Sequence, residues 1–366
     1  MEEFENEKLD EIINPTEIVS PDKKHEVIYY KPMFHRRVMA NFLDILIFAF
    51  LLVSSFVLCR FIVSNTPDYQ NNSAKLDQMR LDSGIYIKDN NDRVSDIITV
   101  LNSSTEYNSE YKKSKTSAAI NKFLTYANSV CEDSDYQVIV KSYRDFRLSS
   151  SMVYSNSESA YNGTPLFVTN EADEVVENPV LFETGAYVPN IYGYYYSNAY
   201  SKYIDDYLQG YIVTKIPGYY ELMKYFSMTL IFADILPAFV FSALITYYLP
   251  MIIFTRGRTT FGKALYKIGL VDSRVLSPTF ARTTARFAIF FFAEMVLSLF
   301  TFGVPFLISF TMMLVTKHKK GFPDYMLGLT EIDMSRTKIY KSYDEADLDK
   351  INSYKEPVDF KVPNFD

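Results

Sequence analysis

Three carboxylates stand within the long apolar stretches of this chain: Asp44, Asp234 and Glu294. An ionised carboxylate in hydrocarbon is costly unless it is paired, hydrogen-bonded or hydrated. Two kinds of chemistry therefore suit these groups. They can hold helices together as ion pairs or helix caps, or they can bind a proton or a cation on a path through a membrane.

Three apolar stretches must position these carboxylates, and each is long enough to cross ~30 Å of hydrocarbon as a helix. They comprise residues 42–63, 226–254 and 287–315. The third contains Gly303 and Pro305, two residues that interrupt helices. It therefore predicts a broken hairpin of two short helices that meet near these residues. Whether this hairpin crosses fully or is re-entrant stays open.

Charge predicts the orientation of the helices. Residues 255–286, between the second and third stretches, hold seven basic residues and one acidic residue. This excess of Lys and Arg places the loop in the cytoplasm by the positive-inside rule. The basic flank at Lys31, Arg36 and Arg37 points to the same side. Two spans then leave residues 65–218, with 13 basic and 20 acidic residues, outside.

The insert at residues 65–218 reads as a folded domain rather than a linker. Residues 117–130 show helical periodicity, whereas the alternating segment 136–143 and the apolar pieces 165–169 and 178–182 are typical of short strands. A tyrosine-rich helix leads from this domain to the second apolar stretch. The predicted fold is an α-helical integral membrane protein, with two clear spans and a broken third segment, that carries an inserted α+β extracytoplasmic domain.

Four segments that flank the apolar stretches resemble the RDD family of bacterial membrane proteins. They are RRVMANFLD at residues 36–44, GRTTFGKALYKIGLV at 257–271, SPTFARTTAR at 277–286 and KGFPDYMLGLT at 320–330. They occur in the order of the family, and each stands at its expected place against the helices. The resemblance covers residues 30–64 and 226–332 and does not extend to the insert.

The resemblance also implies which residues form the family signature. The arginine and the two aspartates for which the family is named correspond to Arg37, Asp44 and Asp324. The chain departs from the family at Pro323, where a histidine is usual. Because cation/proton exchange is reported for some members, the resemblance implies ion transport. The signature positions on this chain are Arg37, Asp44, Gly262, Lys263, Arg286 and Asp324.

Helical geometry adds a prediction for the buried charges. Arg37 and Asp44 are seven residues apart, so they share one helix face about 10 Å apart along the axis. We expect Asp44 to face the other helices near the inner surface. Glu294 should lie at a similar depth and therefore near Asp44, and Asp234 should lie in the outer half. We expect Asp324 to close an inner charge network with Arg37 or with an arginine of the loop.

The segment 257–271 carries the letters FGK but lacks the spacing of a phosphate-binding loop. We expect it to form a turn and an amphipathic helix that lies on anionic headgroups through Lys263 and Lys267.

Several function classes find no support in the sequence. It contains no cluster of metal ligands and no nucleophile motif, so we expect no metal, no cofactor and no enzyme activity, and nucleic acid is not an expected partner. The two cysteines, Cys59 and Cys131, lie in the first helix and in the insert and cannot pair in the predicted topology.

The acidic ends of the chain, at residues 1–17 and 344–366, are low in apolar residues and predict disorder, which we expect to extend over the N-terminal tail at 1–35. The predicted organisation is an acidic cytoplasmic tail at 1–35, a transmembrane helix at 36–64, the extracytoplasmic domain at 65–218, a second transmembrane helix at 219–254, a basic cytoplasmic loop at 255–286, the broken third membrane segment at 287–316 and a cytoplasmic tail at 317–366.

Two functions remain, both in the cell membrane. In the first, the membrane core moves an ion or a small solute, and Asp44, Asp234 and Glu294 form its pathway. In the second, the core is an anchor or assembly partner, and the external domain binds a ligand or a protein. The expected partners are the lipid bilayer, an extracytoplasmic protein or ligand, and further copies of the chain, because so few helices make a thin transporter.

Overall fold

The computed structural model describes residues 17–19, 28–104, 106–157, 159–182, 188, 190–315, 320–336 and 338–355. The chain divides into two compact units. The terminal unit comprises Met1–Arg60 and Asp234–Asp366, and the central unit is Phe61–Ala233. Each unit buries apolar side chains in cores of its own.

Three helices of the described chain are long and apolar enough to cross a membrane, two at the predicted spans and one in the segment predicted to be broken. They are α2 (Phe34–Ser64), the helix Tyr219–Ile253 and the helix Phe280–Phe300. The second and third contain π-helical turns, which are frequent at functional sites. Their parts are α10 (Tyr219–Thr229), Leu230–Ile235 (π), α11 (Leu236–Ala243), Leu244–Tyr248 (π) and α12 (Leu249–Ile253), then α14 (Phe280–Ile289), Phe290–Val296 (π) and α15 (Leu297–Phe300).

The surface of α2 suits lipid rather than water. Only four of its 31 residues are buried, and large apolar side chains such as Phe50 and Phe61 are exposed. A long helix that presents apolar residues almost all round is stable only where hydrocarbon surrounds it.

The predicted break in the third apolar stretch is confirmed. After α15 ends at Phe300, Gly303 adopts a φ of +86°, which favours glycine, and α16 (Val304–Val315) follows. The first arm is longer than predicted, because the helix begins at Phe280 and spans 21 residues. The Thr279 side chain caps this start by accepting a hydrogen bond from a backbone N–H of the first turn.

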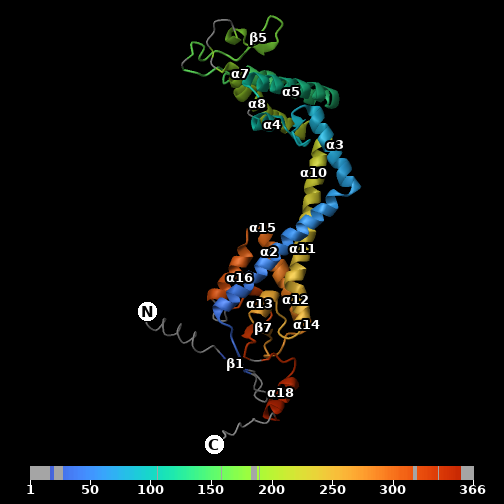
Figure 1. Ribbon diagram of the computed structural model, residues 1–366, viewed down its shortest axis with the longest axis vertical. Helices are drawn as coiled ribbons and strands as arrows, with labels where there is room; N and C mark the ends of the chain where they lie inside the picture. The colour runs from blue at the N-terminus through green and yellow to red at the C-terminus, as the bar shows by residue number, and fades with distance from the viewer. Residues whose placement is uncertain are drawn as a thin grey trace, which may run out of the picture. The chain divides into compact units, whose positions relative to one another are not determined.

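A small cap folds at the end of the helices where α2 begins (Figure 1). Strands β7 and β8, which the third apolar stretch separates in the chain, form a two-stranded antiparallel sheet that pairs Ile268 with Asp333 and Val271 with Thr330. The elements of the cap are β1 (Glu17–Val19), β2 (Ile28–Tyr30), α13 (Phe261–Leu265), β7 (Ile268–Val271), α17 (Phe322–Met326), β8 (Thr330–Asp333) and α18 (Tyr343–Lys355).

The disorder predicted for both ends of the chain is wrong where the structure describes them. Tyr29 on β2 and Ala346 on α18 are buried in one apolar core with Ile332 of β8. A few apolar residues in each end find partners contributed by the other end, which composition alone does not reveal. The rest of the predicted disorder, at residues 1–16, 20–27 and 356–366, lies outside the described residues.

The central unit is built from helices and two short antiparallel hairpins. Its core is rich in aromatic residues, with Phe123, Tyr195 and Tyr203 fully buried. Its elements are α3 (Pro67–Ser83), β3 (Tyr86–Lys88), β4 (Val94–Asp96), α4 (Ile97–Ser103), α5 (Ser109–Val130), α6 (Asp133–Arg147), β5 (Phe167–Thr169), β6 (Val175–Glu177), a 3₁₀ turn (Pro179–Phe182), α7 (Ile191–Tyr194), α8 (Ser201–Tyr203) and α9 (Gln209–Thr214), with π-helical turns at Tyr195–Tyr200 and Ile204–Leu208.

Two of the strands predicted for the insert are wrong. Residues 136–143 lie in helix α6, whose buried residues Ile139, Tyr143 and Phe146 recur every three or four positions. This helical spacing outweighs the alternation, because it forms one continuous apolar face. Residues 178–182 form a 3₁₀ turn. The helix predicted at residues 117–130 and the strand within 165–169 are confirmed.

Candidate functional site

One narrow face of α2 packs against the rest of the terminal unit. Its first buried residues are Arg37, Ala40 and Asp44, at spacings of three and four residues. This confirms that Arg37 and Asp44 share a face. Ala40 between them is fully buried, and its small side chain lets another segment come close.

The segment that comes close is α13. A Cβ atom at Gly262 would overlap the carbonyl oxygen of Ala40 and lie 2.9 Å from Oδ1 of Asp44. The backbone N–H of Gly262 donates to Asp44 Oδ1 at 2.7 Å, and the Thr260 hydroxyl donates to Oδ2 at 2.5 Å. Asp44 therefore holds the first turn of α13 from a different helix, and both of its oxygens are hydrogen-bonded.

A second buried carboxylate, Glu331 on β8, binds two cations. Nζ of Lys263 donates to one oxygen at 2.6 Å, and Nε of Arg37 donates to the other. Burial acts to raise the pKa of Glu331, but Lys263 and Arg37 outweigh burial and hold this pKa well below its usual range.

The prediction that Lys263 lies on lipid headgroups is therefore wrong, because its side chain is buried against Glu331. It is buried because α13 packs directly on α2 through Gly262. Glu331 was missed from the sequence. Its one local signal is that it follows the signature segment 320–330 directly, in a short alternating run.

The remaining signature residues form a third interaction. Nε and Nη2 of Arg286 donate to the two oxygens of Asp324 at 2.5 and 3.2 Å, and both side chains are buried. The expectation that Asp324 pairs with a loop arginine is confirmed, although Arg286 lies on α14. Arg37, the other candidate partner, pairs with Glu331 instead.

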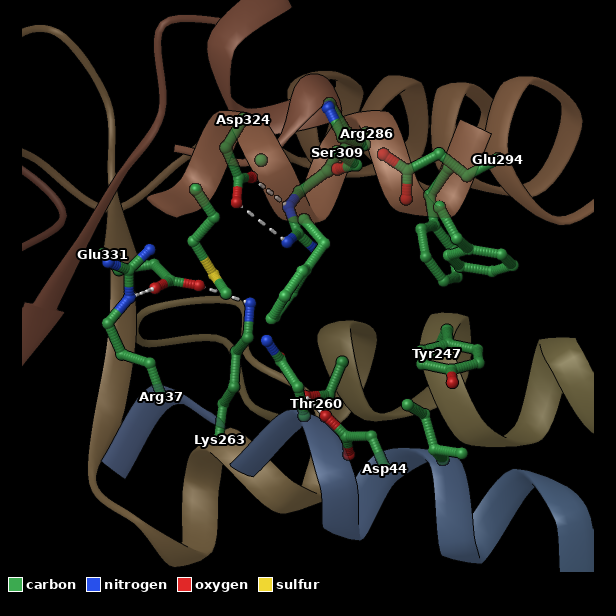
Figure 2. Close-up of a pocket in the computed structure, with 18 of the residues that line it drawn as sticks. Arg37, Asp44, Tyr247, Thr260, Lys263, Arg286, Glu294, Ser309, Asp324 and Glu331 are labelled. Carbon is green, nitrogen blue, oxygen red and sulfur yellow. Dashed lines mark hydrogen bonds and ion pairs between the residues drawn. The ribbon is translucent and has the colours of Figure 1, made fainter. Parts of the chain in front are cut away.

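These side chains surround a cavity of about 220 Å³. Figure 2 shows Asp44 on α2 and Glu294 on the helix Phe280–Phe300 at opposite sides of it. Apolar residues of α16, among them Phe306 and Phe310, form another part of its wall. Its charged lining consists of three cations and four carboxylates: Arg37, Lys263, Arg286, Asp44, Glu294, Asp324 and Glu331.

Glu294 differs from the other carboxylates of this cavity. It is 4 % exposed, and its Oε1 atom has no hydrogen-bond partner among the described residues. The prediction that Glu294 and Asp44 lie near one another is confirmed, since both line the same cavity. Glu294 is thus the group in this cavity best able to accept a proton or a cation.

Asp234 does not line this cavity. It lies in the π-helical turn Leu230–Ile235, and Nη1 of Arg60 on α2 donates to its Oδ2 at 3.1 Å. Arg60 is therefore the ion-pair partner of Asp234, which the residue types and spacing did not reveal. The structure therefore joins two of the three proposed pathway carboxylates in one site and places the third apart from it.

No group of three or more metal-ligating His, Cys, Asp or Glu residues occurs in the part of the chain that the structure describes. Cys59 and Cys131 are both free thiols.

Comparison with known proteins gives one family match. The model of the RDD family matches residues 200–328, which include Gly262, Lys263, Arg286 and Asp324. Arg37 and Asp44 lie outside that range, but in the fold they line the same cavity as the signature residues within it. No curated protein and no solved structure matches the chain. With its three long apolar helices, the chain is a membrane protein that contains an RDD family domain at residues 200–328.

Proposed function

We propose that this protein transports a monovalent cation in exchange for a proton, with Glu294 as the binding group and Asp44 beside it. One observation carries the proposal. The cavity between the apolar helices is lined by three cations and four carboxylates, so it holds one negative charge that no lining cation balances.

Among the described residues, two of the four carboxylates form no ion pair, Asp44 and Glu294, and only Glu294 keeps a buried oxygen without a hydrogen-bond partner. Arg286 pairs with Asp324, and Lys263 and Arg37 share Glu331, while Asp44 is held by Thr260 and Gly262. The Ser309 hydroxyl donates to the Glu294 carboxylate, but no cation among the described residues pairs with it. A buried carboxylate without a paired cation binds either a proton or a cation, because each neutralises its charge in a medium of low dielectric constant. Competition between the two for one group couples their movements.

The size of the cavity suits a small ion. About 220 Å³ leaves room for a monovalent cation with several of its waters, since one water takes up about 30 Å³ of liquid volume. The basic loop at residues 255–286 supports an orientation in which this cavity lies on the cytoplasmic side and residues 65–218 lie outside.

The test is cation-driven proton movement in proteoliposomes, with wild type compared to Glu294→Gln and Asp44→Asn. We expect Glu294→Gln to lower the exchange rate by at least about tenfold, because the amide cannot carry the proton. Asp44→Asn should lower both exchange and thermal stability, because Asp44 also holds α13.

Asp344→Asn, at an exposed carboxylate in the first turn of α18, is the matched control and should exchange like wild type. The abundance and melting temperature of each variant are measured in parallel. Retained exchange in a folded Glu294→Gln protein would overturn the proposal.

The central unit favours a second candidate function. It is a compact unit with its own aromatic core, larger than a linker between two helices requires. In this alternative the helices anchor a domain that binds a ligand or another protein. Wild-type protein with no proton movement above that of protein-free vesicles would favour this function.

A further inference from the structure

We propose that a row of buried hydroxyl groups carries protons, and protons alone, between Asp234 and the cavity at Glu294. The inference rests on the proposed function, because it names the species that crosses the half of the membrane beyond the cavity. It assigns a conducting role to Ser242, Thr246 and Ser298.

The row begins on one face of the helix Tyr219–Ile253. Four residues recur there at intervals of four, so they follow one another along a single stripe. All four have 0 % exposure in a helix whose other faces are largely apolar and exposed. They are Asp234, Ala238, Ser242 and Thr246.

Two neighbouring helices add oxygen atoms to this stripe. The hydroxyl of Ser55 on α2 lies 3.5 Å from that of Ser242. On the helix Phe280–Phe300, Ser298 is buried one turn beyond Glu294, about 6 Å along the axis.

Ring contacts place Ser298 on the side of the cavity towards Asp234. The contacts are those of Tyr248 with Phe287 at 4.9 Å and of Tyr247 with Phe290 at 4.7 Å, as in antiparallel helices. From that level Ser298 lies about 12 Å along its helix, and in the same direction Ser242 lies about 8 Å and Asp234 about 20 Å away.

Oxygen atoms along this row lack protein partners. Four buried atoms in these helices have no hydrogen-bond partner among the described residues. Each such group destabilises the protein unless something else satisfies it. Water molecules bridging these atoms remove that cost, and the same waters link the groups into a chain. The four atoms are Oδ1 of Asp234, Oγ1 of Thr246, Oε1 of Glu294 and Oγ of Ser298.

The row suits protons and not metal cations. Phe239, Ala243 and Met295 form an apolar cluster between the same helices, so oxygen lines only part of the route. A cation there would lose most of its hydration shell without replacement, at a large cost. A proton needs only one donor and one acceptor at each step.

Each transfer conserves atoms and charge. The O–H bond of protonated Asp234 breaks as the oxygen of the next water or hydroxyl gains that proton, and this group releases its own proton to the one after it. The last O–H bond forms at Oε1 of Glu294. Arg60 faces Asp234, whereas Arg286, Lys263 and Asp324 face the Glu294 cavity, so both ends have a cation to stabilise the charged carboxylate.

The test combines Thr246→Val with Ser298→Ala, which remove two hydroxyls and keep nearly the same volume. The control is Ser54→Ala, which removes an exposed hydroxyl beside Ser55. The first readout is the rate at which the Glu294 carboxyl exchanges hydrogen for deuterium, followed by infrared spectroscopy on solubilised full-length protein. The Glu294→Gln protein identifies the band. The second readout is exchange in proteoliposomes.

We expect the double variant to slow deuterium exchange at Glu294 by about tenfold or more, with binding of Na⁺ or K⁺ unchanged and Ser54→Ala like wild type. Unchanged deuterium exchange in the folded double variant would overturn the inference, and so would the absence of any protonated Glu294 band. Slowed deuterium exchange in a protein that moves no cation would support the proton row and reject the proposed transport, so the two failures are distinct.

Discussion

Asp44 and Glu294 show how two carboxylates at one cavity take different roles. Both oxygens of Asp44 accept hydrogen bonds from α13, so this group is structural in the first instance. Glu294 keeps one buried oxygen without a partner among the described residues. Since an unpartnered buried oxygen is costly, binding of a proton or a cation stabilises Glu294 more than Asp44.

Gly262→Ala should destabilise the protein strongly, because the new methyl group would overlap the backbone of Ala40 and crowd Asp44. We expect a loss of about 1–3 kcal/mol, the usual cost of overpacking, seen as a lower melting temperature. Gly210→Ala is the matched control. It lies in α9 with nothing within 4 Å of its Cβ position and should be neutral or stabilising, because alanine favours helix. Equal melting of both variants would contradict the close contact.

Glu331 makes stability depend on pH. Lys263 and Arg37 depress its pKa in the folded protein, so its contribution is complete above the unfolded value of about 4.3 and is lost as the pH falls towards the folded value. Glu331→Gln should cost about 3–5 kcal/mol at pH 7, because two buried cations lose their anion. The loss should shrink on acidification below pH ~4. Denaturant unfolding at several pH values measures it, and a constant difference between variant and wild type would contradict this account.

At the scale of elements, buried ion pairs fasten the cap to the apolar helices. Arg37 of α2 pairs with Glu331 of β8, and Arg286 of α14 pairs with Asp324 of α17. Lys263 of α13 binds the same Glu331 from within the cap. Arg36 adds a bond to Asp333 at 2.6 Å. Buried ion pairs thus join elements that are far apart in the sequence.

The ion pair that joins α14 to α17 can be tested by a double-mutant cycle. Arg286→Gln and Asp324→Asn should each destabilise the protein by about 3–5 kcal/mol, because each leaves one buried charge unpaired. The double variant Arg286→Gln with Asp324→Asn should lose less than the sum of the two, because no unpaired charge remains. Melting temperatures of the four proteins complete the cycle. Strictly additive losses would show that the two residues do not interact.

At the scale of the whole molecule, the chain consists of two units with separate cores. We expect two unfolding transitions in calorimetry. Phe123→Ala, in the core of the central unit, should reduce the free energy of unfolding of that unit by about 3–5 kcal/mol. Its transition temperature should fall, and that of the terminal unit should stay unchanged. Ala346→Gly, in the core of the terminal unit, is the reciprocal variant. A shift of both transitions by either variant would show that the units unfold together.

The sequence by itself determined the features that depend on local composition. The apolar stretches predicted the long helices, and Gly303 with Pro305 predicted the break in the third. The seven-residue spacing of Arg37 and Asp44 predicted their common face. Length, periodicity and helix-breaking residues act within a few turns, so one stretch of sequence is enough to recognise them.

Only the tertiary structure decided how the charges pair. Glu331 as the partner of Lys263 and Arg37, Arg60 as the partner of Asp234, and the cap formed by the two ends were not found from the sequence. The energy of a buried charge depends on groups brought near it by folding, often hundreds of residues away in the chain. Such pairings cannot be read from residue types alone, because several arginines and carboxylates fit the same pattern until packing selects one.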